Sequence, residues 1–383
     1  MANTKHAKIR DEIREAILSG KYRPGQRLPT EAELVRLCSA SRPTVARALR
    51  DLQHEGLVAR RAGSGTYVSE NRGAQGHLFG LIIPRLGETE IFDPICKEVA
   101  RYTQEHYRAA VIWATAGTEA SIDLERKAWQ ACQLCIERRV AGVFFAPLEW
   151  TPNDEEINDR IVQAFDAAKI PVVLVDRDLY CYPRRSRYDR VGIDNRAAGH
   201  VVANHLIKCG CEQIGFLSKP HSAETVKLRL AGYRDALSEH GISVRKSWVV
   251  EGDPGDVEFV RGYLKESDVQ GVVCANDFTA AHLMQTLDQL GIRIPQEMKV
   301  IGIDDVKYAS LLKVPLTTLH QPCKSIGAAA VDALVARIAD PTLPPRDILF
   351  HCELIVRESC GERFGQLSRL TVPLSTTKKA SRL

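Results

Sequence analysis

The chain has 383 residues, more than one typical domain holds, so its length predicts two or three folding units. Hydrophobic residues make up 44% of it, which is ample for buried cores, and no apolar run approaches the roughly 20 residues that span a bilayer. The net charge of +4 is unevenly spread. Residues 1–72 carry 14 Lys and Arg against 8 Asp and Glu, and this net +6 indicates that the N-terminal end is the part suited to nucleic acid.

The eleven cysteines are scattered and odd in number, and the N-terminal residues are polar and charged rather than a secretory signal. This pattern predicts a cytoplasmic protein with reduced thiols. Cys132 and Cys135 have the spacing of a metal-binding pair, but no second pair or histidine cluster accompanies them. We therefore expect buried thiols, no metal site and no cofactor.

The first unit begins with two predicted helices. One covers Lys5–Ser19 and ends at Gly20, a plausible C-cap. The other covers Glu31–Cys38, where Thr30 as N-cap and Glu33 three residues later form a capping box. A short turn then leads into a third helix.

The third helix, Ser41–Leu52, has the pattern of a helix that reads the major groove of DNA. Val45, Leu49 and Leu52 recur at helical spacing, while hydroxyls and guanidinium groups face outward. The segment that follows predicts two short strands around Gly63-Ser64-Gly65, a hairpin whose tip can approach a phosphate backbone. Together they indicate a winged helix-turn-helix.

This order of elements resembles the GntR family of bacterial transcription factors over residues 5–69, including Leu28-Pro29-Thr30-Glu31 and the wing Gly63-Ser64-Gly65-Thr66-Tyr67-Val68. Ala32 and Ala46 stand where many relatives have an arginine, so the operator sequence stays open. The resemblance implies DNA contacts from the start of the reading helix and from the wing, and two further arginines are candidates for base or phosphate contacts. The complete predicted set is Ser41, Arg42, Thr44, Arg47, Arg50 and Gly63.

The rest of the chain predicts an α/β architecture. We expect a DNA-binding domain over residues 1–70, a linker over 71–77, a two-lobed domain over 78–361 and a disordered tail over 362–383. Short apolar runs alternate with helix-length stretches in two consecutive series, which predicts two parallel-sheet lobes. The expected strands are Leu78–Ile83, Ala110–Ala114, Ala141–Ala146, Val172–Val175, Ile214–Leu217, Trp248–Val250, Gly271–Cys274 and Val300–Ile303.

Polar residues follow several of these strands. Asp176-Arg177, Asn276-Asp277, Asp304-Asp305 and Gln321 all come directly after apolar runs. Ligands of parallel sheets bind at the carboxyl ends of strands, and carboxylates, guanidinium groups and amides suit the vicinal hydroxyls of sugars. Each residue could equally be a helix N-cap or turn residue.

A second resemblance covers residues 77–361. Val191-Gly192-Ile193-Asp194-Asn195, Arg229-Leu230-Ala231-Gly232-Tyr233, Val300–Asp305 and Pro315–Thr318 look like the effector domain of the LacI family, which is similar to periplasmic sugar-binding proteins. Ala146 and Pro254 depart from the pattern of sugar-binding relatives, so a purine or another polar metabolite stays open beside a sugar. The effector ligands implied by this resemblance are Phe92, Asp176, Arg177, Arg229, Asn276, Asp304 and Gln321.

The combination resembles repressors of the arabinose-repressor type. It implies a homodimer that binds palindromic double-stranded operator DNA and is released by a small-molecule effector, without enzymatic activity. An effector-dependent activator and the solute-binding protein of a sugar transporter are the alternatives. An aminotransferase-like fusion would need a longer chain and a Schiff-base lysine.

Overall fold

The computed structural model describes residues 5–18, 21–23, 25–54, 57–61, 64–68, 78–84, 91–116, 121–149, 153–220 and 222–361. Contacts divide the chain into two units, Met1–Ile193 with Pro322–Phe350 (unit 1) and Asp194–Gln321 with His351–Leu383 (unit 2). The chain therefore passes from one unit to the other three times. The expected linker and tail lie outside the described residues.

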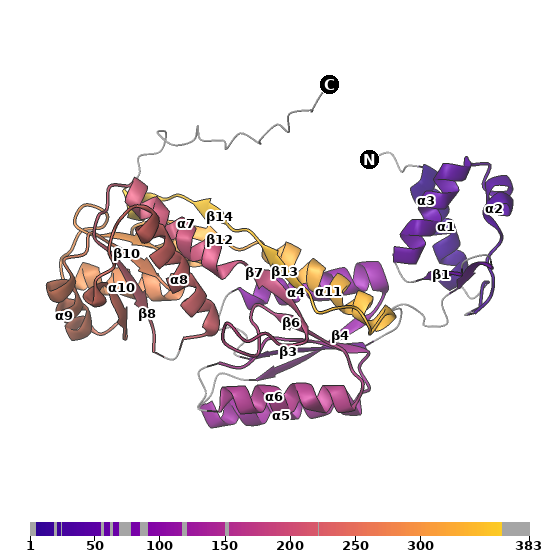
Figure 1. Cartoon of the computed structure of the whole chain (residues 1–383), viewed down its shortest axis with the longest axis horizontal. Coiled ribbons are helices and arrows are strands. Elements are labelled where there is room, and N and C mark those ends of the chain that lie inside the picture. The colour runs from indigo at the N-terminus through magenta and orange to yellow at the C-terminus, as the bar shows by residue number, and fades with distance from the viewer. Residues whose placement is uncertain are drawn as a thin grey trace, which may run out of the picture. The chain divides into compact units, whose positions relative to one another are not determined.

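The head, residues 5–68, contains three helices and a two-stranded wing (Figure 1). Its elements are α1 (Lys5–Leu18), α2 (Glu31–Leu37), α3 (Arg42–His54), β1 (Val58–Arg61) and β2 (Gly65–Val68). The capping box is confirmed, because the Thr30 side chain accepts from the Glu33 amide and the Glu33 carboxylate accepts from the Thr30 amide. The wing is antiparallel, with Val58 opposite Val68. A winged helix-turn-helix is therefore present.

Beyond the head, unit 1 holds a six-stranded parallel sheet in the order β13-β7-β6-β5-β3-β4. Helices α5 and α6 cover one face of the sheet, and α4 and α11 pack together on the other (Figure 1). Strands β5 and β6 are buried along their whole length, as expected where helices cover both faces. The elements are β3 (Leu78–Pro84), α4 (Phe92–Tyr107), β4 (Ala110–Ala116), α5 (Ser121–Glu137), β5 (Gly142–Phe145), α6 (Asp154–Ala167), β6 (Val172–Val175), β7 (Asp189–Ile193), α11 (Cys323–Ala339) and β13 (Asp347–Phe350).

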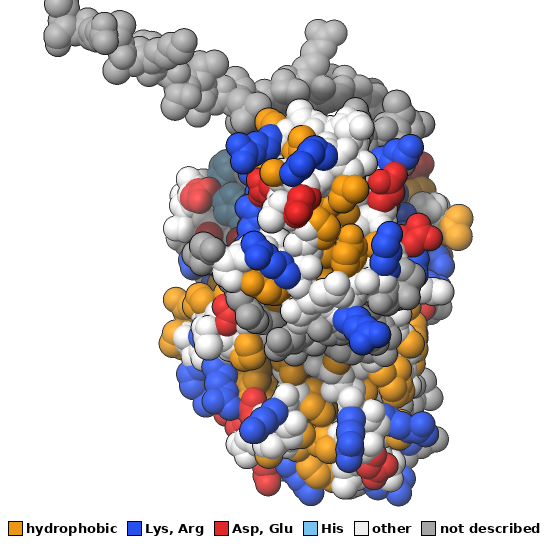
Figure 2. Space-filling model, turned by 90° about the vertical axis from the view of Figure 1, so that its right-hand side faces the viewer, with side chains coloured by type: hydrophobic (Ala, Val, Ile, Leu, Met, Phe, Trp, Pro, Cys, Tyr) orange, Lys and Arg blue, Asp and Glu red, His pale blue; other side chains and the backbone are white. Residues whose placement is uncertain are grey.

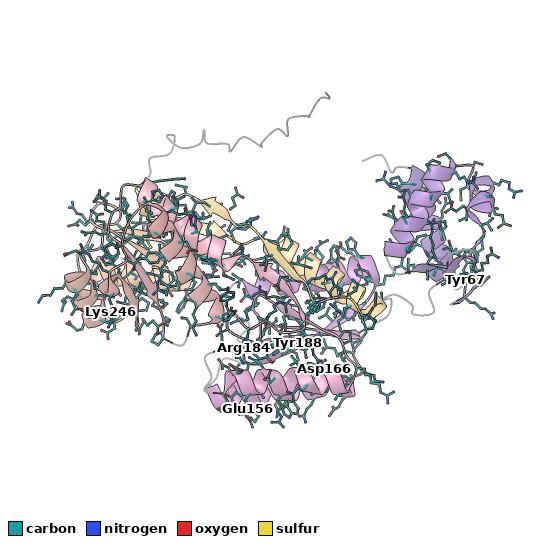
Figure 3. The ribbon with its side chains drawn as sticks, in the orientation of Figure 1. Tyr67, Glu156, Asp166, Arg184, Tyr188 and Lys246 are labelled. Atoms are coloured by element: carbon teal, nitrogen blue, oxygen red, sulfur yellow. The ribbon has the colours of Figure 1, made fainter. Side chains whose placement is uncertain are left out.

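Unit 1 is discontinuous in sequence, unlike the simple succession of two lobes that the strand pattern predicts. The returning segment is held by Asp189, whose buried carboxylate accepts hydrogen bonds from Arg337 and Arg346. Burial alone would raise the pKa of Asp189, but the hydrogen bonds of these two arginines lower it. Nearby, the Tyr188 hydroxyl donates to Asp166 at 2.6 Å, which ties the start of β7 to α6 (Figure 3).

Unit 2 holds a four-stranded parallel sheet in the order β11-β10-β8-β9 and a separate antiparallel pair, β12 and β14. Helices α7 and α8 pack so closely that a Cβ atom on Gly199 or Gly232 would lie 1.8 Å from a backbone carbonyl of the other helix. The elements are α7 (Asn195–Lys208), β8 (Ile214–Ser218), α8 (Glu224–Glu239), η1 (Lys246–Trp248), β9 (Val249–Glu251), α9 (Val257–Ser267), β10 (Gly271–Cys274), α10 (Asp277–Gln289), β11 (Lys299–Ile301), η2 (Lys307–Ser310), β12 (Thr318–His320), β14 (Glu353–Ile355) and η3 (Glu358–Cys360).

Candidate DNA interface and effector-binding residues

Helix α3 separates packing from recognition by its two faces. Val45, Ala48, Leu49 and Leu52 are each 0% exposed and form the centre of the head core. The opposite face leaves the predicted DNA-contacting side chains accessible. Ser41, Arg42, Arg47 and Arg50 are exposed, and Thr44 is half-buried.

The first turn of α3 presents two hydroxyls as a pair. Ser41 Oγ and Thr44 Oγ1 lie 2.6 Å apart, and the Ser41 carbonyl accepts from the Val45 amide. Hydroxyls and free amides at a helix N-terminus are typical phosphate ligands. This end of α3 therefore offers phosphate-positioning groups beside the guanidinium of Arg42.

Two basic residues in or beside the wing were not among the predicted DNA contacts. Arg27 is exposed and pairs through its backbone with Tyr67 of β2, and its guanidinium lies against Gly65, whose φ of +120° favours glycine. Arg60 is held by Glu31 of α2 at 2.5 Å. Gly63, predicted to contact DNA, lies outside the described residues.

Basic side chains are not gathered into one continuous patch on the molecular face that Figure 2 shows. There, Lys and Arg lie dispersed among hydrophobic, acidic and other polar side chains. On this face, charge alone therefore does not outline a DNA-binding surface.

Three of the predicted effector ligands come together in unit 1. Asp176 and Arg177 directly follow β6, and Arg177 Nε lies 3.4 Å from Asp176 Oδ2. The guanidinium carbon of Arg177 lies 5.6 Å from the centre of the Phe92 ring, within the range of a cation–π contact. Arg177 also pairs with Glu149, a half-buried carboxylate that sequence reasoning missed.

The backbone at Asp176 explains a glycine of the LacI-like motif. Asp176 has a φ of +73°, and its carbonyl would lie 2.8 Å from a Cβ atom on Gly192 of β7. A side chain at position 192 would therefore push against the turn that carries Asp176 and Arg177. Gly192 positions these two side chains by leaving room for their backbone.

Three further predicted ligands come together in unit 2. Gln321 Nε2 donates to Asp304 Oδ1 at 2.7 Å, and Arg229 Nη2 lies 3.6 Å from the same oxygen. Arg229 is buried and is held by two hydrogen bonds, from Nε to Asn195 Oδ1 at 2.9 Å and from Nη1 to the Ala275 carbonyl at 2.6 Å. The guanidinium is thus fixed in orientation beside a carboxylate.

Asn276 has a structural role as a helix N-cap, which was the alternative to its role as an effector ligand. It is the N-cap of α10, and its side-chain oxygen accepts from the Thr279 amide at 2.9 Å. Its role as an effector ligand remains a prediction. The adjacent Asp277 is fully buried and accepts from Thr318 Oγ1 and from the Val306 amide, so it braces the strand ends of unit 2.

Two other neighbours of this cluster were missed at the level of sequence. Asn195 lies in one of the LacI-like motifs, but the sequence did not indicate that it holds Arg229. The hydrogen bond between them joins positions 34 residues apart. Cys352 carries no sequence signal. Burial raises the pKa of its thiol to about 12, with Arg229 opposing the rise and Asp304 and Asp194 adding to it. Cys352 is therefore a neutral thiol in the electrostatic field of the predicted ligands.

A separate groove of about 550 Å³ runs beside α10 within unit 2, and it includes His282, Asp288 and Lys313. None of the predicted effector ligands lines it. Among the described residues, no helix is both long enough and apolar enough to cross a membrane.

The comparisons with known proteins match two separate parts of the chain. Residues 5–68 match the gntR family of bacterial regulatory proteins, and residues 203–360 match a periplasmic binding protein-like domain. An arabinose metabolism transcriptional repressor of Geobacillus stearothermophilus is 26% identical over 94% of this chain and 98% of its own length. The transcriptional repressor PurR of Photobacterium profundum is 29% identical over 71% of this chain and 79% of its own length.

A solved structure is also similar to most of the chain. The transcriptional regulator CelR in complex with cellobiose superposes with a TM-score of 0.63 at 25% identity, covering 83% of this chain and 90% of that one. The match with the arabinose repressor extends through both the head and the two-unit domain, whereas the PurR match covers a smaller part of the chain. The chain thus combines a DNA-binding head of the bacterial gntR regulatory family with a periplasmic binding protein-like domain.

Proposed function

We propose that this protein is a cytoplasmic transcriptional repressor that binds a palindromic operator as a homodimer and is released by a small-molecule effector, a sugar. The observation that carries the proposal is α3, which buries Val45, Leu49 and Leu52 and leaves Ser41, Arg42 and Arg47 exposed at its opposite face. This is the arrangement that a helix needs to enter the major groove.

The proposed effector class follows from the two polar groups. Asp176 with Arg177 in unit 1, and Arg229 with Asp304 in unit 2, each place a carboxylate acceptor beside a guanidinium donor. A sugar hydroxyl both donates and accepts, so such pairs suit vicinal hydroxyls. The names of two relatives, an arabinose metabolism repressor and a regulator bound to cellobiose, favour the same class.

The proposed mechanism is a difference in effector affinity between two states of the dimer. An effector that binds the DNA-incompetent state more tightly shifts the population towards it, and operator affinity falls. No chemical step on the effector is required, so we propose binding without catalysis.

The test is an operator-release titration with the full-length protein. The operator is first selected from a random duplex library, and pentoses, hexoses, their phosphates and purines are then added to the complex. Release by one sugar is expected. Retention with every compound, or tighter binding with one of them, would contradict effector-induced release.

Arg229→Ala and Asp304→Ala locate the effector response. Each removes charge-assisted hydrogen bonds worth roughly 1.5–3 kcal/mol, so we expect release to need about 10- to 150-fold more effector while operator affinity stays unchanged. Arg293→Ala is the matched control, because Arg293 is an exposed arginine of the same unit that pairs only with Glu297 among the contacts described. Equal effector responses in all three variants would refute the ligand assignment.

A further inference from the structure

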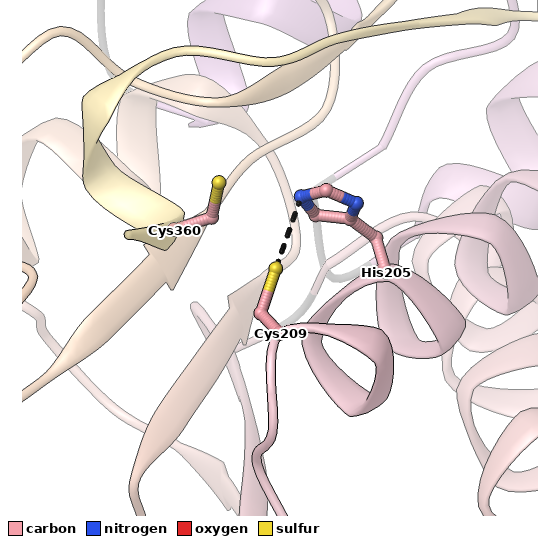
Figure 4. A group of neighbouring side chains, drawn as sticks. All are labelled: His205, Cys209 and Cys360. Carbon is pink, nitrogen blue, oxygen red and sulfur yellow. Dashed lines mark hydrogen bonds between the residues drawn. The ribbon is translucent and has the colours of Figure 1, made fainter. Parts of the chain in front are cut away.

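One cluster of metal-ligating side chains lies outside every residue assigned above. His205 and Cys209 are one helical turn apart at the end of α7, and Cys360 ends η3. Their ligand atoms all lie within 4.8 Å of one another, and the three side chains are neighbours in Figure 4. His205 and Cys360 are 5% and 0% exposed, and Cys209 is half-buried.

The spacing fits a tetrahedral metal centre. His205 Nε2 and Cys209 Sγ lie 3.6 Å apart. Zinc bonds of about 2.3 Å to sulfur and about 2.0–2.1 Å to nitrogen, at a tetrahedral angle, separate the two ligand atoms by roughly 3.6 Å. The same geometry places two sulfurs roughly 3.8 Å apart, within the limit that Cys360 already satisfies.

The Cys360 thiol has two hydrogen-bond partners. Thr317 Oγ1 donates to Cys360 Sγ at 3.2 Å, and a hydroxyl donor stabilises negative charge on sulfur. The thiol lies 3.5 Å from the Arg357 carbonyl, to which it donates while protonated. Metal binding replaces that proton, as it does for any cysteine ligand.

The position on α7 also favours a cation. Cys209 is the C-cap residue of the helix, where the backbone carbonyls give a partial negative charge. Two sulfurs and one imidazole form a soft ligand set, which selects zinc over magnesium or calcium. No fourth His, Cys, Asp or Glu completes the group within the part of the chain that the structure describes, so a tetrahedral ion would keep one position open to water.

We propose that His205, Cys209 and Cys360 bind one Zn²⁺ ion that links the end of α7 to η3 within unit 2. The sequence led us to expect no metal site in this protein. Cys360 lies 151 residues beyond Cys209, so no local spacing could have indicated the group. The ion would hold η3 to the helix that carries Asn195, the hydrogen-bond partner of Arg229.

The test uses full-length protein, kept reduced and stripped of metal with a chelator. Titration with Co²⁺ should produce the visible absorption of a tetrahedral ion and a thiolate charge-transfer band, both saturating at one equivalent. Zn²⁺ should then displace Co²⁺ and raise the melting temperature.

Cys209→Ser and His205→Gln should abolish both the spectrum and the zinc-dependent rise in melting temperature. Cys209 is half-buried, so its variant is expected to fold even if Cys360→Ser does not. Cys181→Ser replaces an exposed thiol and is the control, which should keep both signals.

Three results would overturn the proposal. One is the absence of any cobalt spectrum in the reduced protein, including the case in which the oxidised protein shows a Cys209–Cys360 disulfide instead. Another is a spectrum that survives in Cys209→Ser. The third is stoichiometric binding of Cu⁺ without Zn²⁺, which would reassign the metal.

Discussion

Asp277 is a buried carboxyl group whose charge opposes folding at neutral pH. Burial raises its pKa from 3.8 to about 7, and the nearby Asp304 adds to the rise, while hydrogen bonds from Thr318 and Val306 oppose it. Because the folded pKa exceeds the unfolded one, the folded state holds the proton over a range where the unfolded state has lost it. Stability is therefore greatest below about pH 4 as far as this group is concerned, and falls as the pH rises to about 7.

Asp277→Asn should remove this dependence. The amide is nearly isosteric, and its oxygen can still accept from the Val306 amide. We expect the melting temperature of the wild type to fall more steeply than that of the variant between pH 5 and pH 7, measured by circular dichroism. Equal slopes would show that Asp277 is already ionised in the folded protein at low pH.

Replacing Arg42 distinguishes a contact to a base from a contact to the phosphate backbone. It is exposed at the start of α3, beside the paired hydroxyls of Ser41 and Thr44. If its guanidinium contacts a guanine, Arg42→Ala should cost about 1–3 kcal/mol and relax the preference at one base pair in each half-site. Quantitative binding to a library of single-base operator variants measures both effects. Uniform weakening on all sequences would assign Arg42 to the phosphate backbone instead.

At the scale of elements, the contact between α7 and α8 determines where Arg229 lies. Gly199 would place a Cβ atom 1.8 Å from the Arg229 carbonyl, so the helices approach at a distance that only glycine permits. Gly199→Ala should therefore destabilise the protein by about 1–3 kcal/mol or more, and should weaken the effector response by moving Arg229. Chemical denaturation and the release titration provide the two measurements.

Gly262→Ala is the matched control for that helix contact. Gly262 is an exposed glycine inside α9 with no atom within 4 Å of its added Cβ. Alanine there should stabilise the protein by about 0.5–1 kcal/mol, because glycine loses more backbone entropy on folding. If both variants were equally stable, close packing of α7 against α8 would not limit this fold.

Elements that depend on neighbouring residues could be predicted from the sequence. The capping box at Thr30 and Glu33, the apolar face of α3 and the buried runs of β5 and β6 each depend on neighbouring residues. The return of α11 and β13 to unit 1 was missed, because it depends on Asp189 meeting arginines about 150 residues later.

The same distinction holds for the candidate sites. Asp176, Arg177, Arg229, Asp304 and Gln321 were predicted as effector ligands from motifs and strand ends. The structure places them in two groups, one in each unit, and their role stays a prediction. Glu149 and Cys352 carry no such signal, and neither does the grouping of His205 with Cys209 and Cys360. They are defined only by contacts between distant segments, which no periodicity or spacing records.

At the scale of the whole molecule, the proposal requires two heads to bind one operator. A net charge of +6 on residues 1–72 predicts electrostatic binding to phosphates, with log affinity falling linearly as log salt rises through counterion release. Full-length protein should lose most of its operator affinity between low and moderately high salt. Fluorescence anisotropy on labelled duplexes measures this slope, and affinity that does not change with salt would contradict phosphate contacts.

The spacing of half-sites provides a separate test of the dimer. Two reading helices related by a twofold axis meet successive major grooves about 34–36 Å apart, one helical turn of DNA. Duplexes with one half-site, with the selected palindrome, and with five base pairs inserted at its centre should therefore differ sharply. The palindrome should bind most tightly, and the insertion should reduce affinity to that of a single half-site, because it turns the second site to the opposite face of the helix. Binding that is equally tight on all three duplexes would show that each head acts alone and would exclude the homodimer as the operator-binding form.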